Sequence, residues 1–279
     1  MPRVLGSRWL WLAATVVAAA ALLAAIDLFA EAPAPRPAPV TLTVFAAASL
    51  TDAFGEMAHR FETAHPGVKV RLSFAGSQQL AAQLAQGARA DVFAPADRRW
   101  MDDARAHGRV DGEPRAFARN ALAVIVPAAN PARIGRIADL SRPGVKLVLC
   151  AVSVPAGRHA RELLARLEAA PGCGPGWVAR VLANVVSEED NVRGVVGKVQ
   201  LGEADAGIVY RSDVTVPLRR AVRALDVPDS LNVLAEYPIA VMADAAAMGA
   251  AHAFADYVCG AEGQATLERH GFQPVARVP

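Results

Sequence analysis

The sequence predicts an α/β fold in which mainly parallel sheets are covered by helices on both faces. Short apolar runs, typical of buried strands, alternate along the chain with segments whose apolar residues recur at helical spacing. Strands that alternate with helices pair in parallel, because each helix carries the chain back across the sheet. In such sheets a ligand binds beyond the carboxyl ends of the strands, where the helices begin.

The N-terminal segment, residues 1–39, has the composition of an export signal followed by a linker. Arg3 and Arg8 precede an apolar run over residues 9–25. Asp27 then interrupts this run, which at about 17 residues is near the lower limit for a membrane-spanning helix. The segment therefore predicts export from the cytoplasm.

Processing of this segment has two alternatives. Small residues favour cleavage near Ala30 or Ala32, and the alternative is an uncleaved membrane anchor. Residues 33–39 alternate proline with other residues, a composition typical of a stiff linker. The folded part of the protein is expected to start near Val40.

The first junction between a strand and a helix carries a serine. The apolar run 42–45 predicts a buried strand, and three alanines then lead to Ser49. Helical spacing follows at Leu50, Phe54, Met57 and Phe61. Ser49 and Asp52 match the Ser-x-x-Asp pattern of a capped helix start. The free N–H groups at such a start also attract anions, so Ser49 is either a cap or an anion ligand.

The same order recurs at the second junction. Residues 68–74 alternate apolar and polar side chains as a strand does, and Ser77 follows before a helix over residues 78–86. Two serines at two equivalent helix starts are harder to explain as caps alone. The repetition therefore favours a binding role for Ser49 and Ser77.

The remaining elements continue the alternation. Further strands are predicted at 91–97, 121–127, 145–151, 206–210 and 236–242. Helices are predicted at 98–107, at 158–169 and in the alanine-rich region that ends near 270. The acidic run 187–190 is predicted to open a helix, because acids are favoured in a first turn.

Charge and metal-ligand patterns exclude several classes of protein. The chain of 279 residues has a net charge of +2, and its basic residues do not cluster, so we expect no nucleic-acid partner. The six histidines show no ligand spacing and are expected on the surface. The three cysteines have no metal spacing; Cys150 and Cys173 either form a disulfide or remain free.

Common catalytic motifs are missing from the sequence. No P-loop, dinucleotide fingerprint or nucleophile elbow is found. The acid clusters at 102–103 and 188–190 lie near predicted helix starts, where the helix dipole explains them. Neutral hydrogen-bond donors at the strand ends remain, at Ser49, Ser77, Ala156, Val192 and Tyr210. Such a set predicts anion binding.

These junctions carry a family resemblance. The landmarks are the residues at 44–50, 74–77, 90–93, 154–157, 190–194 and 207–210. In this order and spacing, from about Val40 to Phe272, the chain resembles the periplasmic molybdate-binding proteins of ABC importers. The resemblance implies a two-lobed periplasmic-binding-protein fold. Lobe 1 would comprise residues 40–120 and 236–279, and lobe 2 residues 121–235.

The resemblance also implies a site and a role. Molybdate, and with it tungstate, would be held by Ser49, Ser77, Ala156, Val192 and Tyr210 in the cleft between the lobes, without direct cation ligands or a cofactor. The protein would not be an enzyme. It would be a periplasmic monomer that delivers the anion to an ABC transporter membrane permease.

Two departures from the family pattern keep alternatives open. Gly76 stands where the family often has serine, and residues 150–153 read Cys-Ala-Val-Ser where the family often has acidic or polar residues. Both changes bear on selectivity, so another tetrahedral oxyanion such as sulfate is an alternative ligand. An enzyme on the same scaffold is a further alternative, with an aspartate or a cysteine as nucleophile. Cys150 lies nearest to a matched position.

Overall fold

The computed structural model describes residues 39–225 and 227–275. The predicted export signal and almost all of the predicted linker lie outside the described residues. Within the described ranges, no helix has the length and apolar character needed to cross a membrane.

Nine strands form the centre of the described structure. They are β1 (Val40–Ala47), β2 (Val68–Ala75), β3 (Val92–Ala94), β4 (Val110–Pro127), β5 (Leu147–Cys150), β6 (Val185–Glu189), β7 (Ala206–Tyr210), β8 (Val222–Leu225) and β9 (Leu234–Met242). They lie in the order β2-β1-β3-β9-β4-β7-β5-β6, and β8 pairs with β4. The pairs β1–β2, β1–β3, β5–β6 and β5–β7 are parallel, whereas β4 and β9 pair antiparallel with their neighbours.

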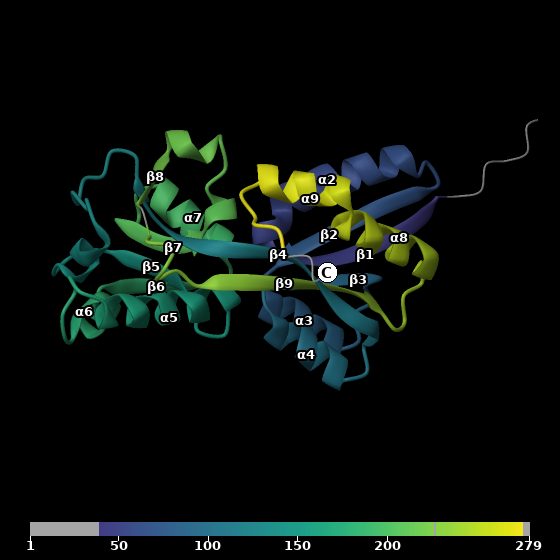
Figure 1. Cartoon of the computed structure of the whole chain (residues 1–279), viewed down its shortest axis with the longest axis horizontal. Helices are drawn as coiled ribbons and strands as arrows, with labels where there is room; N and C mark the ends of the chain where they lie inside the picture. Colours follow the sequence, from purple (N-terminus) through teal and green to yellow (C-terminus); the bar gives the residue numbers. More distant parts are fainter. Residues whose placement is uncertain (1–38, 226, 276–279) are drawn as a thin grey trace, which may run out of the picture. The chain divides into compact units, whose positions relative to one another are not determined.

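Helices cover both faces of these strands (Figure 1). They are α2 (Thr51–Ala64), α3 (Ser77–Ala85), α4 (Arg98–Ala106), α5 (Pro155–Ala169), α6 (Trp177–Ala183), α7 (Val192–Gln200), α8 (Met248–Cys259) and α9 (Ala261–Arg269). Helices α3 and α4 pack on one face of β1, β3 and β9 through Leu80, Leu84 and Met101. Phe54 and Phe61 of α2 and Phe254 of α8 belong to the larger apolar core. The predicted α/β class is confirmed.

Strand β4 is longer than predicted and connects two groups of strands. Up to Ala121 it pairs with β9, and from Leu122 onward it pairs with β7 and β8. The prediction found only its second part, because residues 110–120 are largely polar and contain Pro114. The division into two lobes near this point remains a proposal.

The acidic run after Asn184 differs from its prediction. Residues 185–189 form strand β6, which pairs in parallel with β5, and the next helix begins only at Val192. The predicted helix start at 187–190 is therefore wrong. Glu188 pairs with Arg161 and Glu189 with Lys198, so these two acids form ion pairs beside the sheet. The side chain of Asn191 caps the start of α7 instead.

Candidate functional site

Ser49 lies at the carboxyl end of β1, in a short 3-10 turn over Ala48–Leu50, and is buried. Its hydroxyl lies 2.9 Å from the hydroxyl of Tyr237 on β9. The expected cap with Asp52 does not form: among the described residues no side chain caps this turn or α2, and the Asp52 carboxylate accepts a hydrogen bond from Arg193. Ser49 is therefore free of a capping role.

Ser77 is the first residue of α3 and is also buried. The backbone N–H of Ala96 donates to its Oγ over 2.9 Å. Because this bond occupies an acceptor lone pair, the hydroxyl hydrogen remains available for another partner. Ser77 is thereby held as a donor, and like Ser49 it does not cap its helix.

Ala156 and Val192 contribute backbone N–H groups at two further helix starts. Pro155 begins α5 and has no N–H, so Ala156 carries the first N–H of that helix. At α7 the side chain of Asn191 accepts from the N–H groups of Arg193 and Gly194. The first N–H groups of a helix have no partner inside the helix, so both positions present a donor to a ligand.

Tyr210 ends strand β7 and is buried. Its hydroxyl lies 3.0 Å from Nδ1 of His159, a residue of α5. Burial raises the pKa of Tyr210 well above its ordinary value, so the phenol keeps its hydrogen. Tyr210 is therefore a neutral hydroxyl that can donate.

The structure brings all five predicted residues to one small cavity. It has a volume of about 20 Å³ and is lined by Ala47, Ala48, Ser49, Ala75, Gly76, Ser77, Ala96, Val154, Pro155, Ala156, Asn191, Val192 and Tyr210. No charged side chain is among these lining residues. The wall therefore offers hydroxyls, N–H groups and the starts of α3, α5 and α7, which together suit a small anion.

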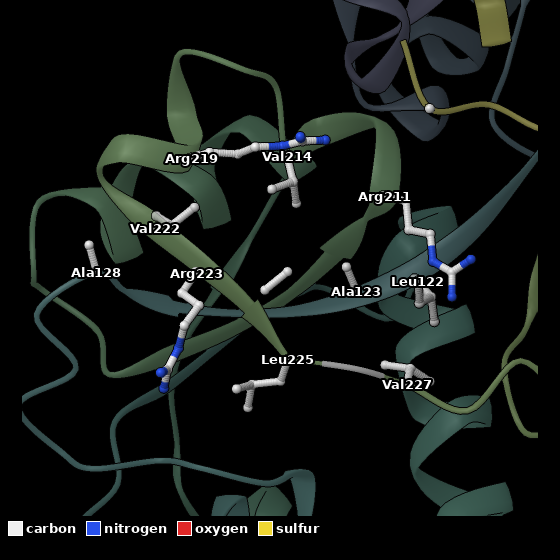
Figure 2. Close-up of a pocket in the computed structure, with 12 residues that line it drawn as sticks. Leu122, Ala123, Ala128, Arg211, Val214, Arg219, Val222, Arg223, Leu225 and Val227 are labelled. Atoms are coloured by element: carbon white, nitrogen blue, oxygen red, sulfur yellow. The ribbon is translucent and has the colours of Figure 1, made fainter. Parts of the chain in front are cut away.

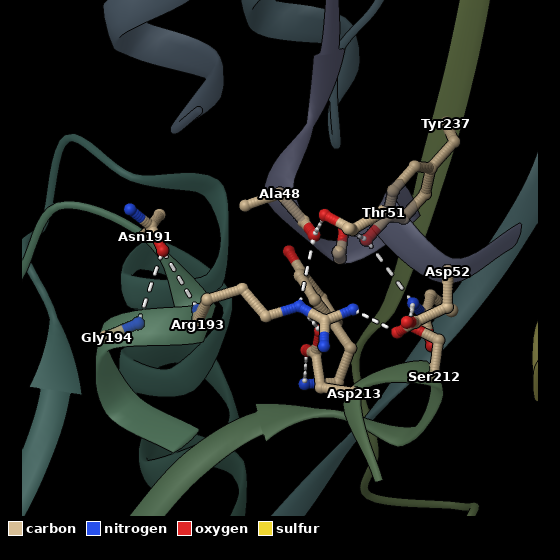
Figure 3. Close-up of polar contacts among 12 residues, drawn as sticks. Ala48, Thr51, Asp52, Asn191, Arg193, Gly194, Ser212, Asp213 and Tyr237 are labelled. Atoms are coloured by element: carbon tan, nitrogen blue, oxygen red, sulfur yellow. Dashed lines mark hydrogen bonds and ion pairs between the residues drawn. The ribbon is translucent and has the colours of Figure 1, made fainter. Parts of the chain in front are cut away.

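Arg193 supplies positive charge near the cavity wall. Its guanidinium donates to the Ala48 carbonyl over 3.3 Å, contacts the Asp52 carboxylate and lies 3.9 Å from Oδ1 of Asp213 (Figure 3). Burial raises the pKa of Asp213 to about 6, although Arg193 and the N–H of Tyr210 act in the opposite direction. Arg193 therefore partly compensates the charge of the buried Asp213 carboxylate, which accepts from the backbone N–H of Tyr210.

Gly76 allows the segments around the cavity to approach each other. A Cβ at this position would lie 2.3 Å from the carbonyl oxygen of Asp190. Beside it, Nε2 of Gln78 donates to the same oxygen over 2.8 Å. The glycine that departs from the family pattern is thus explained by the close contact between residues 76–78 and Asp190.

Cys150 does not suit the role of a nucleophile. It is fully buried at the end of β5 and does not line the cavity. Burial, with Asp213 and Glu189 nearby, raises the pKa of its thiol, whereas a reactive cysteine needs the thiolate. Cys173 and Cys259 are also free, so the Cys150–Cys173 disulfide is not formed.

A larger cavity of about 690 Å³ lies elsewhere, between β4, β8 and the segment after β7 (Figure 2). Leu122, Val222 and Leu225 give it an apolar wall, and the chains of Arg211, Arg219 and Arg223 also line it. None of the five predicted residues contributes to this cavity. Its lining lacks the converging neutral donors of the smaller cavity.

Sequence reasoning missed the groups that hold the donors in place. The hydroxyl of Tyr237 contacts Ser49, but the sequence around Tyr237 predicted only a strand. His159 was expected on the surface, yet it is buried and contacts Tyr210. The sequence did contain an indication of this burial. Leu163 and Leu167 follow His159 at intervals of four, which places His159 on the apolar face of α5.

Comparison with known proteins gives a family match over most of the chain. Residues 42–273 match the family described as bacterial extracellular solute-binding protein. The molybdate-binding protein ModA of Mycobacterium tuberculosis is 38% identical over 270 residues, which cover 95% of this chain and 98% of that protein.

Solved structures extend the likeness of the fold. A periplasmic molybdate-binding protein of Azotobacter vinelandii has a TM-score of 0.73 at 20% identity, covering 84% of this chain and 99% of that one. The sulfate-binding protein SubI of Mycobacterium tuberculosis has a TM-score of 0.74 at 23% identity, with 85% and 88% covered. The shared fold therefore accompanies binding proteins for two different tetrahedral oxyanions.

Proposed function

The chain belongs to the bacterial extracellular solute-binding proteins, and on that basis we propose that it captures molybdate for an ABC importer. One observation carries the choice of site: the five matched residues line a single buried cavity with donors and without a charged side chain. Ser49, Ser77 and Tyr210 would donate from hydroxyls, and Ala156 and Val192 from backbone N–H groups. Tungstate has the same charge and shape and would bind in the same way.

The donor set decides which anions are accepted. Phosphate near neutral pH carries a proton that needs an acceptor, and the cavity wall has no carboxylate to receive it. Placing that P–OH against donors leaves a buried group unpaired, which costs about 1–3 kcal/mol. Molybdate, tungstate and sulfate are fully ionised and need only donors. Size then separates sulfate from the larger two.

Closure around the anion is the proposed mechanism. Ser49 and Ser77 belong to the proposed lobe 1, and Ala156, Val192 and Tyr210 to the proposed lobe 2. An anion that is bound by both sets favours the closed arrangement through its greater affinity for that arrangement. The direct contacts of Gln78 with Asp190 and of Arg158 with Asp97 join the same two parts of the chain.

The family and the N-terminal sequence support a proposal for the cellular setting. We place the protein in the periplasm as a monomer that passes its anion to a membrane permease. It needs no cofactor and performs no reaction. The export signal in residues 1–39 would be cleaved or would remain as an anchor.

Calorimetric titration at pH 7 tests the proposal. The protein should bind molybdate and tungstate tightly, sulfate much more weakly, and phosphate not at all at comparable concentration. The double variant Ser49→Ala/Ser77→Ala should lose molybdate binding while it keeps a cooperative thermal melt. Tighter binding of sulfate than of molybdate would make sulfate the ligand in place of molybdate. Displacement of molybdate by phosphate would contradict the donor-only site.

A further inference from the structure

His159 is a buried histidine that lies behind the cavity wall without lining it. Its side chain extends from α5, is 6% exposed, and contacts one polar group at each ring nitrogen. Nδ1 lies 3.0 Å from the hydroxyl of Tyr210, and Nε2 lies 3.2 Å from Nη2 of Arg158. The ring therefore connects an arginine to a residue of the proposed anion site.

The arginine determines which ring nitrogen carries the hydrogen. A guanidinium has only donors, so the nitrogen that faces it must accept with its lone pair. Nε2 of His159 is that nitrogen, and a neutral imidazole then carries its hydrogen on Nδ1. Burial, with Arg158 beside it, lowers the pKa of His159 to about 4, so the ring is neutral at pH 7.

The direction of the next hydrogen bond follows from this tautomer. Nδ1–H donates to the Tyr210 oxygen, which leaves the single phenolic hydrogen for another acceptor. The Tyr237 hydroxyl is the neighbouring acceptor on the protein, and an anion in the cavity offers a charged one. With the opposite tautomer, Tyr210 would donate to His159 and would present a lone pair to the anion.

Arg158 is itself fixed from another part of the chain. Its guanidinium donates to Oδ2 of Asp97 over 2.6 Å, and the carboxylate of Asp97 is almost fully buried. Asp97 is the N-cap of α4, where its Oδ1 accepts from the N–H of Trp100. Both carboxylate oxygens are engaged, so Arg158 is held where it can donate to His159.

We propose that His159 is a positioning residue of the anion site: held by Arg158 in the Nδ1–H tautomer, it fixes Tyr210 as a hydrogen-bond donor toward the bound oxyanion. This inference rests on the proposed function, because it concerns the same site. It assigns His159 no contact with the ligand. Its effect on binding passes entirely through the Tyr210 hydroxyl.

Nitrogen NMR on ¹⁵N-histidine-labelled protein tests the tautomer without any ligand. One histidine should show a neutral ring with its hydrogen on Nδ1 at pH 7, and its signals should vanish in His159→Leu. Arg158→Met keeps the stem of the side chain but removes the donor, so the same signals should move toward the Nε2–H form. A wild-type ring that is protonated on Nε2 alone would overturn the proposal.

A double-mutant cycle tests the effect on molybdate affinity. Tyr210→Phe removes one hydrogen bond to a charged ligand and should raise Kd about 10- to 100-fold. His159→Leu should raise Kd by a similar factor, and the double variant should be no weaker than Tyr210→Phe alone. Arg158→Met in the same cycle provides the second test if His159→Leu does not fold.

The outcomes separate this inference from the proposed function. A wild-type protein that binds no tetrahedral oxyanion refutes the function, and the NMR result still reports the tautomer. A wild-type protein that binds molybdate and loses affinity in Tyr210→Phe supports the function. If His159→Leu and Tyr210→Phe are then additive, or if His159→Leu has no effect, His159 does not act through Tyr210 and the inference is wrong.

Discussion

The Ser77 side and the Tyr210 side of the cavity hold their hydroxyls in different ways. The Ser77 oxygen accepts from a backbone N–H, which cannot titrate or change its direction. The Tyr210 oxygen accepts from an imidazole, whose tautomer depends on Arg158 and, through it, on Asp97. A donor can thus be fixed by the backbone alone or by a chain of side chains. Only the second arrangement responds to pH and to single substitutions outside the cavity.

The largest effect is expected on the Ser77 side, because its hydroxyl has two roles. Ser77→Ala should weaken molybdate binding by about 1.5–3 kcal/mol through the lost bond to a charged ligand. It should also lower the free energy of unfolding by about 1–3 kcal/mol, because the buried N–H of Ala96 loses its acceptor. Calorimetric titration and urea melts measure the two effects.

Ser73→Ala serves as the matched control for this comparison. Ser73 lies on β2, close in sequence to Ser77, but it does not line the cavity. The control should change neither Kd nor stability by more than about 0.5 kcal/mol. If Ser77→Ala reduces stability but leaves Kd unchanged, the serine is structural and the site assignment fails at this position.

The next effect concerns pH and belongs to the Tyr210 side. The pKa of His159 falls from 6.5 in an exposed chain to about 4 in the folded protein. Between these values the unfolded chain takes up a proton that the folded protein does not, so His159 lowers stability as pH falls. The loss approaches about 3 kcal/mol at pH 4.

Asp213 changes the stability with pH in the opposite direction, so its contribution must be separated from that of His159. Burial raises its pKa from 3.8 to about 6, so the folded protein holds this proton first and gains stability as pH falls through that range. The difference between wild type and His159→Leu cancels the contribution of Asp213. Urea melts from pH 7 to pH 4 should show this difference shrinking, whereas the exposed control His107→Leu should follow the wild type throughout.

A smaller effect is expected where the two sides meet. Gly76→Ser restores the residue that the family often has, but its Cβ would lie 2.3 Å from the Asp190 carbonyl oxygen. The segments must then separate, at a cost of about 1–3 kcal/mol that should appear as a weaker affinity for molybdate. Gly67→Ser, with open space around its Cβ, is the control and should bind as the wild type does. Equal affinities in both variants would refute the steric explanation.

The smallest effect compares two ion pairs. The Asp97 carboxylate is 5% exposed beside Arg158, whereas Asp52 is 41% exposed beside Arg193. Exposed pairs contribute at most about 1 kcal/mol, so Asp52→Asn should change Kd less than about fivefold. Asp97→Asn should change it more, because it releases Arg158 from His159. An equal response of the two variants in titration would show that burial does not distinguish these pairs.

The sequence predicted the elements whose pattern is local. Strands β5 and β7 are continuous apolar runs, and the five predicted donors follow strand ends whose residues match a family pattern. Strand β6 was misread because the preference of acids for a helix start is weaker than pairing with β5. The first half of β4 was missed because a largely polar run becomes a strand only beside β9.

In the candidate site, too, the sequence predicted the local features and missed the contacts between distant residues. The five cavity-lining residues that we propose as donors could be named from the sequence, because each belongs to a short contiguous motif. Their supporting partners could not, because Ser49 meets Tyr237 and Ser77 meets Ala96 only after folding. His159 lies between these cases: its helical position indicated burial, but its partner Tyr210 is 51 residues away along the chain.

Pro155 at the start of α5 has a consequence for the entropy of binding. Its ring fixes φ, and the next two residues are small, with the α-carbon of Gly157 packed directly against the Ala151 backbone. The Ala156 N–H is therefore oriented before any anion arrives. Gly157 beside it is held by this packing, so its backbone does not become more flexible in the unliganded protein. An anion that binds here orders little additional backbone, so most of the enthalpy of this hydrogen bond is retained as affinity.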